Sequence, residues 1–338
     1  MSLSRPFVRN GNPTVSTTGG LDRREVFSIV IPVYNNEGSL GELLGQLTAL
    51  RERLASEIEL VFVDDGSVDA SPTILADLLQ TWPGMASLVR HSRNFGSFAA
   101  IRTGLSHING SYVAVMAADL QEPISLIEEF HRELVDARRP LVVGVRHGRN
   151  DPASSAFSSR LFWKLYRRFV QPDMPAGGVD VFGCSHDVVD QLLSLRESNT
   201  SLVGQLIWLG FPRSEIPYDR QARHSGVSGW TLRKKLRYMA DSVFSFTDLP
   251  IRLVVATGLF GVVTSLAVGI AVLVARFTTD LQTPGYTPIV LTITFTGALI
   301  LLALGVIGSY VWRTYENTKG RPRSVIRDVR RFGQGSNR

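Results

Sequence analysis

Residues 27–63 read FSIVIPVYNNEGSLGELLGQLTALRERLASEIELVFV, and this stretch decides the fold. Its two ends, 27–33 and 59–63, are short runs rich in β-branched residues, as in buried strands. Between them, residues 39–56 carry leucines at helical spacing. The stretch therefore predicts a β-α-β unit, in which a helix joins two parallel strands.

The same alternation continues beyond this unit. We expect further helices at 71–81 and 97–108, and further strands at 86–90 and 112–116. Strands that alternate with helices favour an α/β fold with a mostly parallel sheet covered on both faces. Ligands of such sheets bind beyond the carboxyl ends of the strands.

Two acidic loops follow predicted strands at those ends. Residues 63–67 read VDDGS, and residues 118–121 read ADLQ. If the second loop is extended, Asp119 and Gln121 point to the same side. Their oxygens suit the divalent cation that usually accompanies a nucleotide diphosphate. Each loop alone is also a common turn or helix-cap sequence, so neither is specific by itself.

Two apolar segments, about 253–275 and 288–312, exceed the roughly 20 residues that cross a bilayer and contain no internal charge. We therefore predict two transmembrane helices in a multi-pass protein of the cytoplasmic (inner) membrane. The first 219 residues carry 20 Lys and Arg against 25 Asp and Glu, and the remainder carries 16 against 5. Basic residues beside the spans favour a cytoplasmic catalytic domain with both termini cytoplasmic. They would also attract anionic membrane lipids.

This charge distribution argues against nucleic acid as a partner, although the pI is about 9.7, because the basic excess lies beside the apolar segments. The single cysteine, Cys184, excludes an intrachain disulfide. Residues 154–170 mix aromatic and basic side chains at helical spacing, which fits either an interfacial amphipathic helix or an ordinary surface helix.

The expected organisation has five parts. These are a disordered segment (1–24), a catalytic domain (25–230), a juxtamembrane amphipathic helix (231–250), the two spans (251–312) and a basic cytoplasmic tail (313–338).

Several motifs occur together along residues 26–327, and the combination is more specific than its parts. They are IPVYN (31–35), VDDGS (63–67) with Asp69, RNFG (93–96), MAADLQEP (116–123), and GSY (308–310) with RPR (321–323). With these motifs the chain resembles the family 2 inverting glycosyltransferases of GT-A fold, particularly the polyprenyl-phosphate glycosyltransferases. Bacterial enzymes that charge undecaprenyl phosphate with glucose or an aminoarabinose share the two-helix tail, and dolichol-phosphate mannose synthases are similar.

The resemblance implies transfer of a sugar from a nucleotide donor, expected to be a UDP-sugar, to the phosphate of undecaprenyl or decaprenyl phosphate. The product would be a lipid-linked sugar for cell-envelope glycan or lipid modification. It also implies Mg²⁺ or Mn²⁺ on Asp119 and Gln121, and a homo-oligomer, with a tetramer suggested by similarity to related enzymes. A lipid phosphate is already an anion near pH 7, so catalysis reduces to positioning and to stabilising the departing diphosphate.

The resemblance also assigns roles to individual residues. Asp119, Arg146 and Arg160 are the expected catalytic residues, and Arg146, Arg160 and Lys164 would hold the acceptor phosphate. Arg160 could instead contact lipid headgroups. The expected donor-nucleotide residues are Pro32, Tyr34, Asn36, Asp64, Ser67, Asn94, Ala118, Asp119, Arg220, Arg223 and Ser228.

Arg220 and Arg223 stand before Gly226 and Ser228, in what the resemblance identifies as a flexible loop that closes over the donor diphosphate. A solvated basic loop beside acidic lipids is the alternative.

Three positions depart from the family pattern. Ala117 replaces the first acid of the D-A-D motif, Asn36 stands where an acid usually follows Tyr-Asn, and Gly229-Trp230 replaces a more usual Lys-Tyr. Ala117 keeps a second hypothesis open, a catalytically silent membrane scaffold or accessory protein. A processive polysaccharide synthase would need more spans and a Gln-x-x-Arg-Trp motif.

Overall fold

The computed structural model describes residues 26–54, 56–146, 166–168, 171–175, 178–197, 200–221, 243, 247, 249–278 and 286–333. The expected disordered segment 1–24 lies outside these ranges, as do residues 154–165 and 231–242 of the two expected amphipathic helices. Four expected site residues also lie outside them, namely Arg160, Lys164, Arg223 and Ser228.

The predicted β-α-β unit is present. It consists of β1 (Val26–Val33), α1 (Leu40–Arg53) and β2 (Glu57–Asp64), with β1 and β2 parallel. The alternation then continues as expected through α2 (Ser71–Gln80), β3 (Ala86–His91), α3 (Ser97–Leu105) and β4 (Tyr112–Val115).

The rest of the domain completes one sheet. Its elements are α4 (Ile124–His131), a π-helical turn η1 (Arg132–Asp136), β5 (Leu141–Arg146), β6 (Val181–Ser185), α6 (His186–Ser194), α7 (Leu202–Trp208) and β7 (Arg213–Tyr218). The strand order is β7-β5-β6-β4-β1-β2-β3-β8. Four of the seven strand pairs are parallel, and β6 and β8 run antiparallel to their neighbours. The expected α/β fold with a mostly parallel sheet is therefore confirmed.

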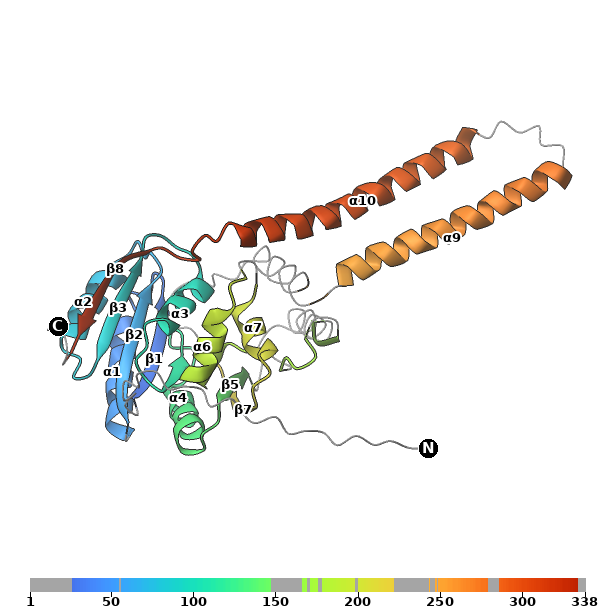
Figure 1. The fold of residues 1–338 in the computed structure, drawn as a ribbon. Helices are drawn as coiled ribbons and strands as arrows, with labels where there is room; N and C mark the ends of the chain where they lie inside the picture. Colours follow the sequence, from blue (N-terminus) through green and yellow to red (C-terminus); the bar gives the residue numbers. More distant parts are fainter. Residues whose placement is uncertain are drawn as a thin grey trace, which may run out of the picture.

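Helices cover both faces of this sheet (Figure 1). Buried leucines of α1 pack with α2 and α4 against one face, and α3, α6 and α7 pack against the other. Gly104 of α3 lies so close to β1 that an added Cβ would stand 2.3 Å from Val30 Cγ1. A residue without a side chain is therefore needed where α3 meets the sheet.

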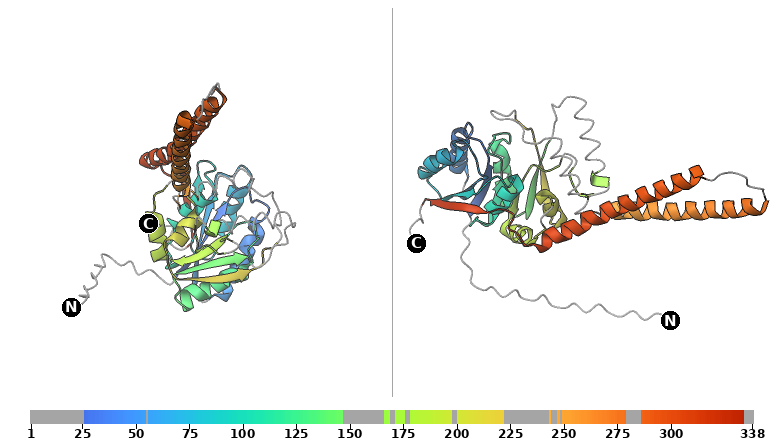
Figure 2. Two further views of the ribbon diagram at one scale, coloured as in Figure 1. Left: turned by 90° about the vertical axis from the view of Figure 1, so that its right-hand side faces the viewer. Right: turned by 90° about the horizontal axis from the view of Figure 1, so that it is seen from above.

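Two long helices, α9 (Leu249–Thr278) and α10 (Tyr286–Thr318), extend side by side away from the sheet domain (Figures 1 and 2). They approach closely at Gly261, where an added Cβ would lie 3.7 Å from Leu299 Cδ1. Both expected apolar segments fall within these helices. In the described part of the chain, one helical stretch, Phe295–Thr318, has the length and apolar composition to cross a membrane. A second crossing through α9 stays a prediction.

After α10 the chain returns to the sheet. Residues expected to belong to a basic tail form β8 (Ile326–Phe332), which pairs antiparallel with β3 at the edge of the sheet (Figure 1). Sequence analysis did not predict this strand, because four of its seven residues are charged. Charged side chains are common on edge strands, and their pairing depends on a distant partner rather than on local pattern.

Candidate active site

The loops after β1 and β2 are interlocked and carry several of the predicted donor residues. The Asn35 amide donates to Ser67 Oγ (3.0 Å), and the Val68 amide donates to Asn35 Oδ1 (3.0 Å). The Asn36 amide donates to Ser71 Oγ (2.9 Å). Tyr34 remains exposed beside these contacts. Residues 64–71, which we call the donor loop, are thus held against the end of β1.

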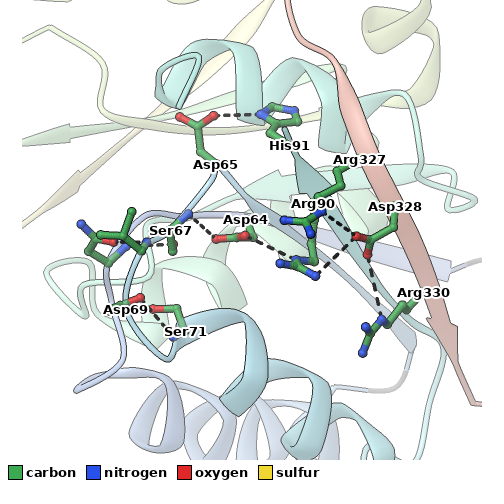
Figure 3. Close-up of polar contacts among 12 residues, drawn as sticks. Asp64, Asp65, Ser67, Asp69, Ser71, Arg90, His91, Arg327, Asp328 and Arg330 are labelled. Atoms are coloured by element: carbon green, nitrogen blue, oxygen red, sulfur yellow. Dashed lines mark hydrogen bonds and ion pairs between the residues drawn. The ribbon is translucent and has the colours of Figure 1, made fainter. Parts of the chain in front are cut away.

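Asp64 is almost completely buried at the start of the donor loop. Its Oδ1 accepts the Ser67 amide (3.1 Å), and its Oδ2 lies 3.8 Å from Nε of Arg90 on β3 (Figure 3). The Asp64 carboxylate therefore fixes the shape of its own loop, through one backbone hydrogen bond and one ion pair.

Asp65, which sequence analysis did not select, holds the RNFG loop in place. Its Oδ1 lies 2.8 Å from His91 Nδ1 and accepts the Phe95 amide, also at 2.8 Å, while Oδ2 accepts the Gly96 amide at 2.7 Å. Asn94, a predicted donor residue, is exposed in this loop beside Phe95. A carboxylate that accepts several backbone amides orders the loop that donates them.

Gly66 allows the two loops to meet. It has a φ of 72°, and an added Cβ would stand 2.5 Å from the backbone carbon of Arg93. A side chain there would meet both a conformational penalty and a backbone clash. The Asp-Gly-Ser turn is thus required by packing as well as by its backbone angles.

The second acidic loop begins at the same sheet edge, where the Ser39 hydroxyl donates to the Ala118 carbonyl (2.7 Å). This loop is not extended, because Leu120 has a φ of 57°, so the condition under which Asp119 and Gln121 would point to the same side is not met. The Gln121 amide instead turns back toward Asp119 Oδ1, at 3.4 Å. Asp119 is half-buried, and Gln121 is buried.

Arg220 lies against this loop. Its guanidinium donates to Gln121 Oε1, and the Gln221 amide donates to the Gln121 carbonyl at 2.9 Å. The Gln121 side-chain amide donates in turn to the Gln221 carbonyl (3.4 Å). The segment that follows β7 is thus held against the second acidic loop, with Arg220 beside the two expected metal ligands.

Arg146, at the end of β5, forms an ion pair with Asp180, which also accepts the Tyr218 hydroxyl at 3.1 Å. Burial lowers the pKa of Arg146, but Asp180 and Tyr218 raise it by more, so its pKa lies above the ordinary value. Arg146 therefore stays cationic. Sequence analysis assigned no role to Asp180. The feature of the sequence that could have indicated a role for Asp180 is its position directly before the apolar run that forms β6.

Glu122 is a third residue that sequence analysis missed, after Asp65 and Asp180. Burial, reinforced by the charges of Asp119 and Asp180, raises the pKa of Glu122 to about 7 against the opposing effect of Arg220. Its Oε2 accepts the amide of Ala117 at 3.3 Å. The signal in the sequence was an acidic residue directly after Gln121.

These electrostatic contacts join the two halves of the predicted site. Glu122 acts on the pKa of Tyr218, and Asp180 acts on the pKa of Glu122. Asp119 and Arg220, which were predicted for the donor, and Arg146, which was predicted for the acceptor, consequently belong to one charged cluster at the carboxyl ends of the strands.

The oxygen atoms in this cluster are of the kind that bind a divalent cation, but the described residues do not by themselves form a complete metal site. Among the described residues, no group of three or more His, Cys, Asp and Glu could hold a metal ion. Asp119 and Gln121 offer the hard oxygens that Mg²⁺ and Mn²⁺ accept, and the diphosphate of a donor would supply further ones.

The model of the family described as "Glycosyl transferase family 2" matches residues 28–192. The putative glycosyltransferase CsbB of Bacillus subtilis (strain 168) is 33% identical over 307 residues, covering 91% of this chain and 93% of the relative. A bactoprenol glucosyl transferase of Shigella phage SfX is 30% identical over 301 residues, covering 89% and 98%.

Solved structures that are similar to this chain include glucosyl-3-phosphoglycerate synthase from Mycobacterium tuberculosis in complex with UDP. It has a TM-score of 0.48 and 18% identity, and the match covers 65% of this chain and 79% of that one. The full-length similarity to CsbB, together with the family match, identifies the chain as a glycosyltransferase that belongs to glycosyl transferase family 2.

Proposed function

We propose that this glycosyltransferase moves a sugar from a UDP-sugar to the phosphate of a membrane polyprenyl phosphate, undecaprenyl or decaprenyl phosphate, with inversion. The single observation that carries the proposal is the charged cluster that brings Arg146 together with Asp119, Gln121 and Arg220. Similarity to a bactoprenol glucosyl transferase over about nine-tenths of the chain supports the lipid acceptor.

In the proposed reaction an oxygen of the lipid phosphate attacks the anomeric carbon while the bond from that carbon to the donor diphosphate breaks. The nucleoside diphosphate leaves, and no proton transfer is needed because the attacking phosphate is already an anion. Arg146 would orient the acceptor phosphate through its guanidinium. Arg220 would lie against the departing diphosphate and offset its charge.

Asp119 and Gln121 are the residues that would hold Mg²⁺ or Mn²⁺. When bound, the cation would offset negative charge on the diphosphate. Arg160, Lys164, Arg223 and Ser228 remain proposed participants outside the described residues, the first two for the acceptor and the others for the donor.

The proposal places α9 and α10 as a hairpin in the cytoplasmic membrane, with the catalytic domain and both termini on the cytoplasmic side. Two long helices that lie side by side support this placement, and α10 contains the stretch Phe295–Thr318, which has the length and apolar composition to cross a membrane. The acceptor phosphate would then lie at the bilayer surface, close to the domain. Anionic lipids would favour docking of the basic flanks, and we propose a homo-oligomer as the working form.

The test uses full-length protein in nanodiscs, undecaprenyl phosphate and a panel of UDP- and GDP-sugars, with Mg²⁺, Mn²⁺ or EDTA. The expected result is a glycosylated lipid from one donor, which EDTA suppresses. Ala117 favours a second candidate, a silent membrane scaffold, because it removes one acid from the site. Failure of every donor to yield product, with the folded protein confirmed by its melting temperature, would support the scaffold.

A further inference from the structure

Three charged residues form a row across the edge of the sheet next to the donor loop. Asp64 ends β2, Arg90 lies opposite it on β3, and Asp328 lies opposite Arg90 on β8. Arg90 Nε is 3.8 Å from Asp64 Oδ2, and Arg90 Nη1 is 3.4 Å from Asp328 Oδ2 (Figure 3). One guanidinium thus bridges a carboxylate of the donor loop and a carboxylate near the C-terminus.

A second chain of contacts runs beside the first. It begins at Asp65, which follows Asp64, and continues through His91, which follows Arg90. Asp65 Oδ1 lies 2.8 Å from His91 Nδ1, and His91 Nε2 lies 2.9 Å from Thr103 Oγ1. Thr103 Oγ1 lies 2.8 Å from Ser324 Oγ, just before β8. Asp65 and His91 are buried, so this chain of hydrogen bonds lies inside the domain.

Both chains end in residues 323–332, which we call the C-terminal segment. This segment follows α10 and is fastened to the domain along its length. Arg323 donates to the carbonyls of Leu195 and Glu197, and the Ser92 amide donates to the Val325 carbonyl at 2.9 Å. The consecutive carboxylates of the donor loop are therefore both connected to the chain that leaves the second long helix. Asp64 is connected through Arg90 of β3, and Asp65 through His91 of β3 and Thr103 of α3.

We propose that the C-terminal segment positions the donor loop, with Asp328 and Ser324 as positioning residues for the donor nucleotide. The proposal rests on the proposed function for the assignment of the donor loop to a nucleotide. Asp328 shares the charge of Arg90, so Arg90 neutralises Asp64 without drawing it away from the Ser67 amide. Ser324 fixes the Thr103 hydroxyl that orients His91, and His91 orients Asp65.

Loss of Asp328 leaves Asp64 as the partner of Arg90 in this row. The guanidinium then moves closer to Asp64 Oδ2 and changes the carboxylate orientation that holds Ser67. The donor loop loses its preorganised shape, so nucleotide affinity falls while the acceptor side of the site stays unchanged.

The experiment compares Asp328→Asn and Ser324→Ala with Asp77→Asn in the full-length protein in nanodiscs. Asp77 is exposed on α2, and its substitution removes the same charge outside the row. UDP affinity is measured by calorimetry, and the KM values for donor and acceptor by steady-state kinetics. Asp328→Asn should weaken UDP binding and raise the donor KM roughly three- to tenfold, as expected for a partly buried ion pair. The acceptor KM should stay within about twofold, as should every value for Asp77→Asn.

Hydrogen exchange provides a readout that does not require turnover. Amides of residues 64–71 should exchange faster in Asp328→Asn than in Asp77→Asn, with a smaller change in Ser324→Ala. Unchanged exchange and unchanged UDP affinity in Asp328→Asn would overturn the inference, even if the wild type makes glycosylated lipid. Faster exchange in a protein that glycosylates no lipid would support the positioning role and overturn the proposed function alone.

Discussion

At the scale of single residues, the adjacent acids Asp64 and Asp65 of the donor loop contact different partners, because successive residues at the end of a strand face opposite sides of the sheet. Asp64 meets Arg90, whereas Asp65 meets His91 and the amides of the RNFG loop. The sequence motif VDDGS predicts the loop and its place, but not this division. The different partners of Asp64 and Asp65 depend on which residues of β3 lie opposite the end of β2, and the long-range pairing of these strands determines that register.

Asp119→Asn should lower lipid glycosylation at least about 100-fold, because the amide neither balances a cation nor binds one well. The melting temperature should change little, since Asp119 is only half-buried. The measurement is product formation by thin-layer chromatography beside a thermal melt. Glu52→Gln, an exposed change on α1, is the control. Near-normal turnover in Asp119→Asn would remove Asp119 from the site.

Glu122 predicts a pH dependence of stability. The pKa of Glu122 is raised from 4.5 to about 7, so the folded protein binds this proton more tightly than the unfolded chain. Its contribution to stability is therefore largest at low pH and is lost as the pH rises between those two values. Glu122→Gln should flatten this part of the melting-temperature profile. A profile that falls as steeply as in the wild type would contradict the assigned pKa.

At the scale of elements, hydrophobic period was enough to predict the β-α-β unit and the helices and strands that follow it through β4. Those elements bury continuous apolar faces, which local sequence records directly. β8 carries Arg327, Asp328, Arg330 and Arg331 and gains its structure from β3, so its pattern indicates a solvated tail. The turn at Leu120 was not predicted for a related reason, since a backbone turn there is not specified by hydrophobic pattern.

Gly104→Ala should destabilise the domain although alanine favours helices. The new methyl group would overlap Val30, and overpacking of this kind typically costs about 1–3 kcal/mol. Gly41→Ala is the matched control, because a Cβ on Gly41 of α1 meets nothing within 4 Å. Thermal melts should show a lower melting temperature for the first variant and an equal or higher one for the second. Equal shifts in both would argue against close packing of α3 on β1.

At the scale of the whole molecule, the proposed hairpin connects a lipid acceptor to a water-soluble donor. The long apolar segments 253–275 and 288–312 could be recognised from the sequence because length and apolar composition are local properties of the chain. The return of the chain from α10 to the far edge of the sheet could not, since residues 323–332 carry no pattern that names β3 as their partner.

Thiol labelling tests the proposed topology. Thr283→Cys, between the two helices, should react in intact cells with a membrane-impermeant maleimide, whereas Arg321→Cys should react only after lysis. Background should be low, because burial raises the pKa of the single native thiol, Cys184. Labelling of Arg321→Cys in intact cells would contradict a hairpin with both ends in the cytoplasm.

The antiparallel pairing of β3 with β8 has a consequence for how the protein is made. Arg90 and Asp328 are 238 positions apart, so during translation one edge of β3 stays unpaired until β8 has been synthesised. During that interval the unpaired backbone N–H and C=O groups of β3 can form hydrogen bonds with strands of other protein chains. A soluble fragment that stops before α9 would keep this edge open permanently, and clumping of such a fragment would reflect the missing strand rather than a faulty catalytic domain.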